Sequence, residues 1–291
     1  MTHTTLQRNT AVLAAVAALA ACSLAAQAAD WSDTSIGARY GTKYAEPFNP
    51  NDIKKGIVNL NHVSGYKYGT NFFNADFLMS DSKDPGGAGS TNGAQEVYIV
   101  YRHTLDLAKV TGSAYKFGPV RGVGLTAGFD VNAKTDAGYN SKKRMIVAGP
   151  TLFVDVPGFL NVSLLALWES NAPYNSFSGV STPRYHYDVH PMVNLAWSVP
   201  FNIGIALSFE GFANFIASKG KNEFGGDTAA ETNIDMQVMY DMSPLFGATK
   251  NTFKLGIEYQ YWNNKFGNNH KGIAGPGATA KTPMIRAEYH F

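Results

Sequence analysis

The stretch Met284-Ile285-Arg286-Ala287-Glu288-Tyr289-His290-Phe291 decides the fold, because its side chains alternate between two classes. Ile285, Ala287, Tyr289 and Phe291 are apolar or aromatic, whereas Arg286, Glu288 and His290 between them are polar. A period of two places successive side chains on opposite faces of a β-strand. The end of the chain is therefore predicted to be a strand with one apolar face and one polar face.

The same alternation recurs upstream, over residues 123–131, 203–210, 233–241 and 253–262. In each segment the charged side chains share one face, and the polar face also holds many glycines and other small residues. A soluble β-sandwich alternates too, but its solvated face carries more Lys, Glu and Thr. A crowded polar face is typical of the lumen of a transmembrane β-barrel.

Twelve segments read as strands, and the connections between them alternate in length. They lie near residues 34–44, 57–68, 70–80, 95–105, 120–132, 144–156, 160–171, 184–199, 201–216, 231–242, 252–263 and 282–291. Long loops on one rim and short turns on the other are typical of outer-membrane barrels. A sheet exposed to lipid must close, because an open edge leaves backbone groups unpaired. We predict an all-β protein, a closed antiparallel transmembrane β-barrel of about 12 strands, with the N- and C-termini periplasmic.

Residues 1–29 have the features of a signal peptide, and residues 30–291 form the predicted barrel. Arg8 precedes an apolar run, and Ala26-Gln27-Ala28 is a small-x-small cleavage site. Leu19-Ala20-Ala21-Cys22 also resembles a lipobox, in which Cys22 would be lipidated. Both interpretations export the chain, and with the barrel pattern they predict the outer membrane of a Gram-negative bacterium.

Composition excludes several classes of protein. Charged residues make up 16% of the chain, against about a quarter in ordinary soluble proteins. A formal net charge of +2 does not provide the positive field that nucleic-acid binding needs. One cysteine allows neither an internal disulfide nor a cysteine-rich zinc site.

The alternation assigns a set of side chains to the lumen. These side chains should determine which solutes can pass. The predicted ionisable lining has more acids than bases and should disfavour phosphates and free carboxylates. It consists of Arg39, Asp76, Glu96, Arg102, Asp130, Asp155, Glu169, Asp188, Glu210, Asp235, Asp241, Lys254, Glu258, Arg286 and Glu288.

Aromatic side chains fall on the same inward positions: Phe72, Tyr98, Phe153, Phe212 and Trp262. Rings stack on flat solutes, and carboxylates or amides such as Asn74 accept hydrogen bonds from sugar hydroxyls. This combination suits a nucleoside. The alternative for each ring is that it fills the lumen or belongs to an interfacial girdle.

An enzymatic alternative rests on His186, Asp188 and His190, which share one face if residues 184–199 are a single strand. Side chains two residues apart on a strand lie roughly 6.5–7 Å apart, which is wide for metal chelation. A hydrogen-bonded cluster in the lumen is the favoured interpretation. The sequence has no serine-nucleophile motif, phosphate-binding loop or dinucleotide fingerprint. We therefore expect no enzyme, no cofactor and no metal.

Three stretches carry a resemblance to a known family: 30–35 (DWSDTS), 66–76 (YKYGTNFFNAD) and 94–103 (AQEVYIVYRH). They resemble the Tsx/OmpK family of nucleoside-specific outer-membrane channels, and the OmpK-type branch more than the enterobacterial nucleoside channel. The resemblance implies a twelve-stranded monomer whose narrow lumen, aromatic on one side and ionisable on the other, passes nucleosides. Some members also serve as phage or colicin receptors.

The terminal Phe291 resembles the signal by which barrels are handed to their insertion machinery. The expected partners are therefore the lipid bilayer, nucleosides and that machinery, with phage or colicin as further candidates. A general small-solute porin and a non-conducting receptor or structural barrel are the alternative functions.

Overall fold

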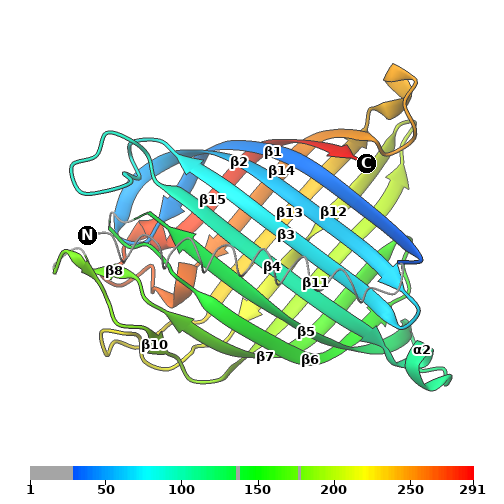
Figure 1. The fold of residues 1–291 in the computed structure, drawn as a ribbon, viewed down its shortest axis with the longest axis horizontal. Coiled ribbons are helices and arrows are strands. Elements are labelled where there is room, and N and C mark those ends of the chain that lie inside the picture. The colour runs from blue at the N-terminus through cyan, green and yellow to red at the C-terminus, as the bar shows by residue number, and fades with distance from the viewer. Residues whose placement is uncertain (1–28, 136–137, 176–177) are drawn as a thin grey trace, which may run out of the picture.

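The computed structural model describes residues 29–135, 138–175 and 178–291, and twelve long strands dominate them. The strands are β1 (Trp31–Glu46), β2 (Asn49–Tyr66), β3 (Gly69–Ser80), β4 (Gln95–Asp106), β5 (Val120–Lys134), β6 (Arg144–Val154), β7 (Phe159–Asn171), β11 (His190–Asn202), β12 (Ala206–Ile216), β13 (Glu231–Asp241), β14 (Phe253–Asn263) and β15 (Thr279–His290). Each pairs antiparallel with its neighbours in the chain, and β15 pairs with β1 from Ser35↔His290 to Gly41↔Met284. The sheet is therefore a closed barrel, as predicted (Figure 1).

The remaining elements are short. They are the strands β8 (Tyr174–Asn175), β9 (Val180–Ser181) and β10 (Tyr185–His186), the helix α2 (Leu107–Thr111), and the 3-10 turns η2 (Ser243–Phe246), η3 (Lys265–Gly267) and η4 (Pro276–Ala278). Asp106 caps α2 by accepting a hydrogen bond from the Ala108 amide, and Gly112 ends it with a φ of 75°. Among the residues that the structure describes, no helix is long and apolar enough to span a membrane.

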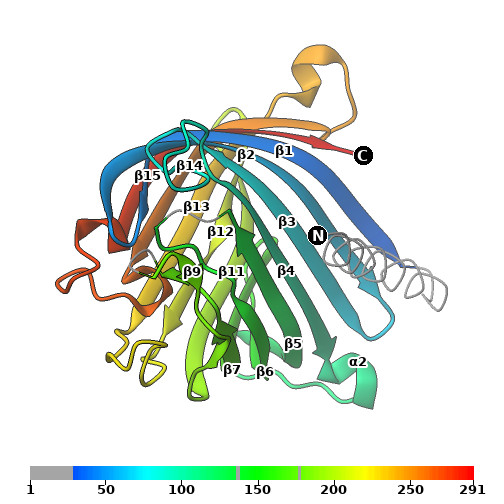
Figure 2. The ribbon, with the colours of Figure 1, turned by 60° about the vertical axis from the view of Figure 1, so that its left-hand side comes forward.

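The two rims of the barrel differ, as the connection lengths predict. We call one the loop rim; its connections are 47–48, 81–94, 135–143, 172–189, 217–230 and 264–278. The other, the turn rim, has the connections 67–68, 107–119, 155–158, 203–205 and 242–252. Figure 1 shows α2 and the carboxy terminus at the turn rim, and Figure 2 shows the loops at the opposite end.

Side chains alternate across the wall as the sequence predicts. Along β5, Leu125, Phe129 and Val131 are exposed on the outside, whereas Thr126, Asp130 and Asn132 are buried inside. Large exposed apolar side chains cover the outer wall of many strands; examples are Ile36, Val58, Leu60, Phe77, Ile146, Leu164, Trp168, Phe215, Leu255, Ile257 and Ile285. The barrel thus has an apolar exterior and a largely polar interior.

Two expected boundaries are wrong. The segment 184–199 is not a single strand, because β11 begins only at His190, and His186 belongs to the two-residue β10. The turn after β11 lies at 203–205, whereas the expected strands 184–199 and 201–216 placed it near residue 200. Asn202 Oδ1 accepts a hydrogen bond from the Gly204 amide at 2.8 Å, and Gly204 has a φ of 93°. The asparagine–glycine pair therefore makes the turn, and Pro200 remains inside the strand pairing.

The first hairpin is also longer than expected. β1 and β2 continue to a two-residue turn at Pro47 and Phe48, where the sequence favoured a loop. Apolar side chains reverse their usual direction there, since Tyr44, Ile53 and Ile57 are buried against Met284 inside the barrel. The predicted signal peptide and Cys22 lie outside the described residues, apart from Ala29, and the side of the membrane on which the termini lie stays a prediction.

Candidate functional site

Most of the predicted site residues occupy inward positions on the barrel wall. These are Arg39, Phe72, Asn74, Asp76, Glu96, Tyr98, Arg102, Phe153, Glu169, His190, Glu210, Phe212, Asp235, Glu258, Trp262, Arg286 and Glu288. They do not form one site. They divide into a network in the middle and turn-rim part of the interior and two clusters near the loop rim.

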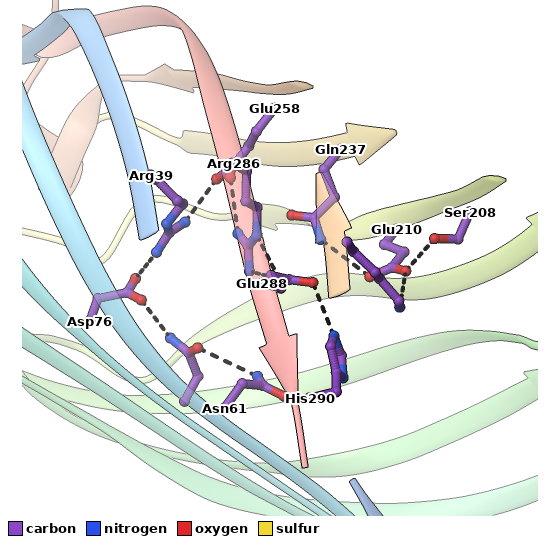
Figure 3. A network of polar contacts seen from close by, with 12 residues as sticks. Arg39, Asn61, Asp76, Ser208, Glu210, Gln237, Glu258, Arg286, Glu288 and His290 are labelled. Atoms are coloured by element: carbon purple, nitrogen blue, oxygen red, sulfur yellow. Dashed lines mark hydrogen bonds and ion pairs between the residues drawn. The ribbon is translucent and has the colours of Figure 1, made fainter. Parts of the chain in front are cut away.

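The central network links carboxylates and guanidinium groups across four strands (Figure 3). Arg39 donates to Asp76 at 2.6 Å and to Glu258 at 2.8 Å. Arg286 bridges the same Glu258, at 2.9 Å, to Glu288, at 2.6 Å. Charge-assisted pairs of this kind hold both partners in fixed positions. The network forms an ordered ladder of alternating charge on the inner wall.

Amides and a lysine extend this network around the wall. Glu210 accepts hydrogen bonds from Ser208 at 2.5 Å, Gln237 at 3.2 Å and Lys254 at 3.2 Å. On the other side, Asn74 donates to Asp76 at 3.0 Å, and Asn61 lies beside it (Figure 3). The side chain of Asp76 is 20% exposed, and that of Glu210 is 17% exposed. Polar atoms here remain within reach of solvent or a solute.

The first loop-rim cluster gathers three lysines. Lys55 lies 2.5 Å from Glu46, Lys265 lies 3.0 Å from the same carboxylate, and Lys134 lies 2.8 Å from Asp84. The Lys55 and Lys134 side chains are only 1% and 2% exposed. Burial lowers the pKa of Lys265, against the attraction of Glu46. The Glu96 carboxylate, 3.8 Å from Lys55, belongs to this packed cluster.

The second loop-rim cluster surrounds Glu169 on the opposite wall. Its carboxylate lies 2.6 Å from Lys219, 3.6 Å from His190 Nε2 and 4.0 Å from Lys143. Burial opposes the charge on Lys143, but the surrounding anionic groups, Glu169 foremost, together outweigh it and raise the pKa of Lys143. Lys219 also lies 4.2 Å from the centre of the Tyr187 ring.

These lysines correct the prediction of a markedly acidic lumen. Lys55, Lys134, Lys143, Lys219 and Lys265 are all buried near the loop rim and pair with the inward carboxylates. Four of them lie in connections or at the end of a strand, and Lys55 lies in the segment expected to be a loop. Alternation carries no signal in such places. These lysines therefore offset much of the predicted acidic excess in the described interior.

The inward aromatic residues have different surroundings. Phe72 is 37% exposed, so its ring face is open to the interior. Phe153 lies over Gly122 and Gly124, and Tyr98 donates to Asp130 at 3.3 Å. Trp262 is buried against Phe266, with ring centres 5.0 Å apart, and donates to Glu231 at 2.7 Å. Trp262 is therefore packing in this conformation and presents no free stacking face.

Loops from opposite sides of the ring meet over the loop-rim mouth. Tyr139 follows β5, and Phe266 follows β14, on the far side of the barrel; their ring centres are 6.1 Å apart. Phe48, in the first hairpin, lies 5.8 Å from the same Tyr139 ring. Burial raises the pKa of Tyr139. We call Tyr139, Phe266 and Phe48 the aromatic lid, because they bridge the mouth.

The cluster predicted from His186, Asp188 and His190 does not form. His186 and Asp188 are exposed in the loop before β11, and His190 alone points inward, where Nδ1 contacts the Asp188 carbonyl at 2.8 Å. The prediction failed because it assumed one continuous strand. Within the described ranges, no group of three His, Cys, Asp or Glu side chains is arranged to hold a metal ion.

No protein-family model matches the sequence, and no curated protein sequence matches it. Solved outer-membrane barrels are similar in structure. A KdgM porin is 9% identical with a TM-score of 0.41, over 88% of this chain and 99% of that chain. The translocator domain of the autotransporter NalP from Neisseria meningitidis is 12% identical with a TM-score of 0.46, over 98% and 97%. The COG4313 outer membrane channel from Pseudomonas putida F1 is 14% identical with a TM-score of 0.49, over 91% and 97%. At such identities the similarity says nothing about a solute, and membership of the Tsx/OmpK family stays a prediction.

Proposed function

We propose that this chain is a passive channel of the Gram-negative outer membrane for small, neutral, planar and hydroxylated solutes of the nucleoside class. The observation that carries the proposal is the juxtaposition of an open ring face at Phe72 with partly exposed hydrogen-bonding groups at Asn74 and Asp76. The Tsx/OmpK resemblance points to the same solutes.

Membrane insertion is supported by the outer wall. Exposed Ile, Leu, Val and Phe side chains cover strands of 11 to 18 residues, and ring closure satisfies the backbone within the sheet. A closed barrel with an apolar exterior is one of two architectures that satisfy every backbone group in hydrocarbon. In water the same surface would be an aggregation hazard.

Selection for neutral solutes follows from the pairing of charges. Arg39 and Arg286 are paired with the carboxylates of Asp76, Glu258 and Glu288, so the wall has little net field to attract free ions. A sugar hydroxyl can exchange hydrogen bonds with such a wall without bringing an uncompensated charge. A base can stack on the Phe72 ring, a contact of ~1–3 kcal/mol where aromatic–base stacking has been measured.

The aromatic lid makes passage conditional. Tyr139 and Phe266 bridge the mouth, and the lysine clusters beneath them are almost fully buried. A solute must therefore pass while these loop contacts are open. We infer a channel that switches between a state in which these loop contacts are formed and an open state.

The test is single-channel conductance of the refolded mature protein in a planar bilayer, titrated with adenosine, thymidine and, as a control, glucose. We expect brief openings and a saturable block by both nucleosides but not by glucose. Conductance without any block would indicate a general small-solute porin and contradict the nucleoside proposal.

A second candidate function is favoured by the same lid. A mouth closed by loop contacts fits a non-conducting barrel whose loops serve as a receptor surface, for example for phage or colicin. Absence of conductance in both the unmodified protein and a lid-deficient variant would favour this receptor. We further propose a monomer, inserted through recognition of the strand that ends at Phe291.

A further inference from the structure

A groove runs along the outer wall, away from the lumen. It has a volume of about 590 Å³ and lies over β13, β14, β15 and β1. Its lining is mainly apolar and includes Tyr40, Val238, Ile257, Pro283 and Ile285. On a smooth barrel wall such a hollow is a site where an apolar chain can lie along the strands.

A second, polar pocket of about 690 Å³ lies at the loop rim. Lys43, Lys271, Lys281 and His270 line it, together with one carboxylate, Asp52. The three lysines are exposed, and within the described residues none of them forms an ion pair. This contrasts with the interior lysines of the two loop-rim clusters, which are buried near carboxylates. The pocket therefore carries positive charge that no ion pair among the described residues neutralises.

The two hollows follow one another along the same strands. In β15 the groove includes Pro283 and the pocket includes Lys281; in β14 the corresponding residues are Tyr259 and Tyr261. In β1, Thr42 lines the groove and Lys43 lines the pocket. The apolar groove thus leads directly to the basic pocket at the loop rim.

The local sequence explains why the wall is hollow there. The ladder between β1 and β15 runs regularly up to Gly41↔Met284 and stops where Pro283 follows. Proline has no N–H to donate, and a register shift follows in β1 between Gly41 and Tyr44. Within the groove, the outward positions at this break hold the small side chains of Thr42 and Pro283, whereas Lys43 lies in the neighbouring pocket.

We propose that this surface binds one phosphate-headed lipid of the leaflet at the loop rim. An acyl chain lies in the groove, and the phosphate lies against Lys43 and Lys281, with Lys271 above it. Charge complementarity selects an anionic headgroup, and the apolar groove selects a lipid over free phosphate. The inference rests on the proposed membrane placement and goes beyond solute transport, because the site is on the outer wall.

The experiment is native mass spectrometry of the refolded mature barrel in detergent. It is titrated separately with phosphatidic acid, with phosphatidylcholine of the same chains and with inorganic phosphate. We expect one phosphatidic acid to bind saturably and to bind more tightly than either control. At about 1 kcal/mol for each basic side chain near an anionic lipid surface, Lys43→Gln with Lys281→Gln should weaken binding roughly thirtyfold.

Matched variants separate charge from shape. Lys109→Gln with Lys116→Gln removes two exposed lysines at the turn rim and should leave binding unchanged. Thr42→Trp fills the groove and should weaken phosphatidic acid binding, whereas Ala38→Trp, outward on the same strand but outside the groove, should not. Circular dichroism confirms that each variant is folded before its binding is compared.

Three results would overturn the inference: equal affinity for both lipids, inorganic phosphate binding as tightly as phosphatidic acid, or unchanged binding in the Lys43/Lys281 variant. The conductance of the same proteins keeps this question apart from the proposed function. If the barrel binds the lipid selectively but never conducts, this inference stands and the proposed channel function is contradicted. A nucleoside-blocked channel without lipid preference would do the reverse.

Discussion

The loop-rim half and the turn-rim half of the interior contain the same kinds of side chain in different states. Near the loop rim, Lys55 and Lys134 are 1% and 2% exposed. Towards the other end, Asp76 and Arg102 are 20% and 18% exposed. Both halves pair their charges. The pairs of the two loop-rim clusters are nearly fully buried, whereas the other half holds both buried carboxylates, such as Glu258 and Glu288, and partly exposed side chains.

This difference indicates that the loops, rather than the strands, cover the loop-rim end of the interior. The strands place polar side chains on much of the inner wall, beside buried apolar clusters such as that of Met145, Val147 and Leu165. Near the loop rim, Asp84, Lys143, Lys219 and Lys265 enter from loops or strand ends to complete the buried pairs. A buried pair whose partner is lost costs far more free energy than an exposed one. The two halves should therefore respond differently to equivalent substitutions.

The largest contrast is expected between Glu169→Gln and Glu210→Gln. The first leaves Lys143 and Lys219 buried without their carboxylate, which should lower the free energy of unfolding by about 3–5 kcal/mol. The second affects a pair with partly exposed side chains and should cost about 1 kcal/mol or less. Urea unfolding of both variants in the same detergent measures the difference. Equal losses would show that the two halves are equally hydrated.

Opening the aromatic lid should have the next largest effect. Tyr139→Ala removes ring contacts to Phe266 and Phe48, each worth about 0.5–1.5 kcal/mol beyond burial. We expect the open probability in single-channel recordings to rise about tenfold. Tyr115→Ala, in a turn-rim connection, is the control and should leave gating unchanged. If both variants gate like the parent, the lid does not close the conducting path.

Stacking in the wetter half can be tested with Phe72→Ala. Losing a ring worth about 1 kcal/mol should weaken nucleoside block about fivefold and leave the conductance for small ions nearly unchanged. Phe77→Ala, in the same strand but exposed on the outer wall, is the matched control. If nucleoside block is insensitive to both changes, the solute does not stack on the Phe72 ring.

The smallest expected effect is a change in ion preference. Glu210→Lys reverses a partly exposed charge and should shift the permeability ratio towards anions by about two- to threefold. The reversal potential under a salt gradient measures this shift, and an unchanged value would contradict the assigned register.

Glu96→Lys, in contrast, adds a fourth lysine to the buried loop-rim cluster around Lys55. We therefore expect it to reduce the yield of folded barrel.

Much of the wall could be predicted from the sequence. Alternation is a direct consequence of strand geometry, so Arg39, Glu258 and Arg286 could be placed inward without a structure. The long loops from 81, 132, 217 and 263 could be recognised from Gly, Asn and Ser clusters. Each of these inferences depends only on neighbours in the chain.

The closure of the mouth could not be predicted, because it depends on contacts between distant segments. Lys265 and Glu46 are separated by 219 positions, and Tyr139 meets Phe266 across the ring. A lysine in a loop is usually solvated, so its type alone indicates nothing about burial. Trp262 packs on Phe266, four positions further along the chain in η3, which agrees with the alternative that the ring fills the lumen. The charge of the lumen was mispredicted because it depends on lysines that these loops contribute.

The pairing of the first strand with the last has a consequence for assembly. Ser35 meets His290 only when the whole chain is present, so β1 has no partner on one side until β15 arrives. Contacts of such long sequence separation close late and slowly. Until then both terminal strands offer open edges that other chains could pair with. The Glu46–Lys265 contact lies near the same seam, so the burial of this lysine also depends on segments that are far apart in the chain.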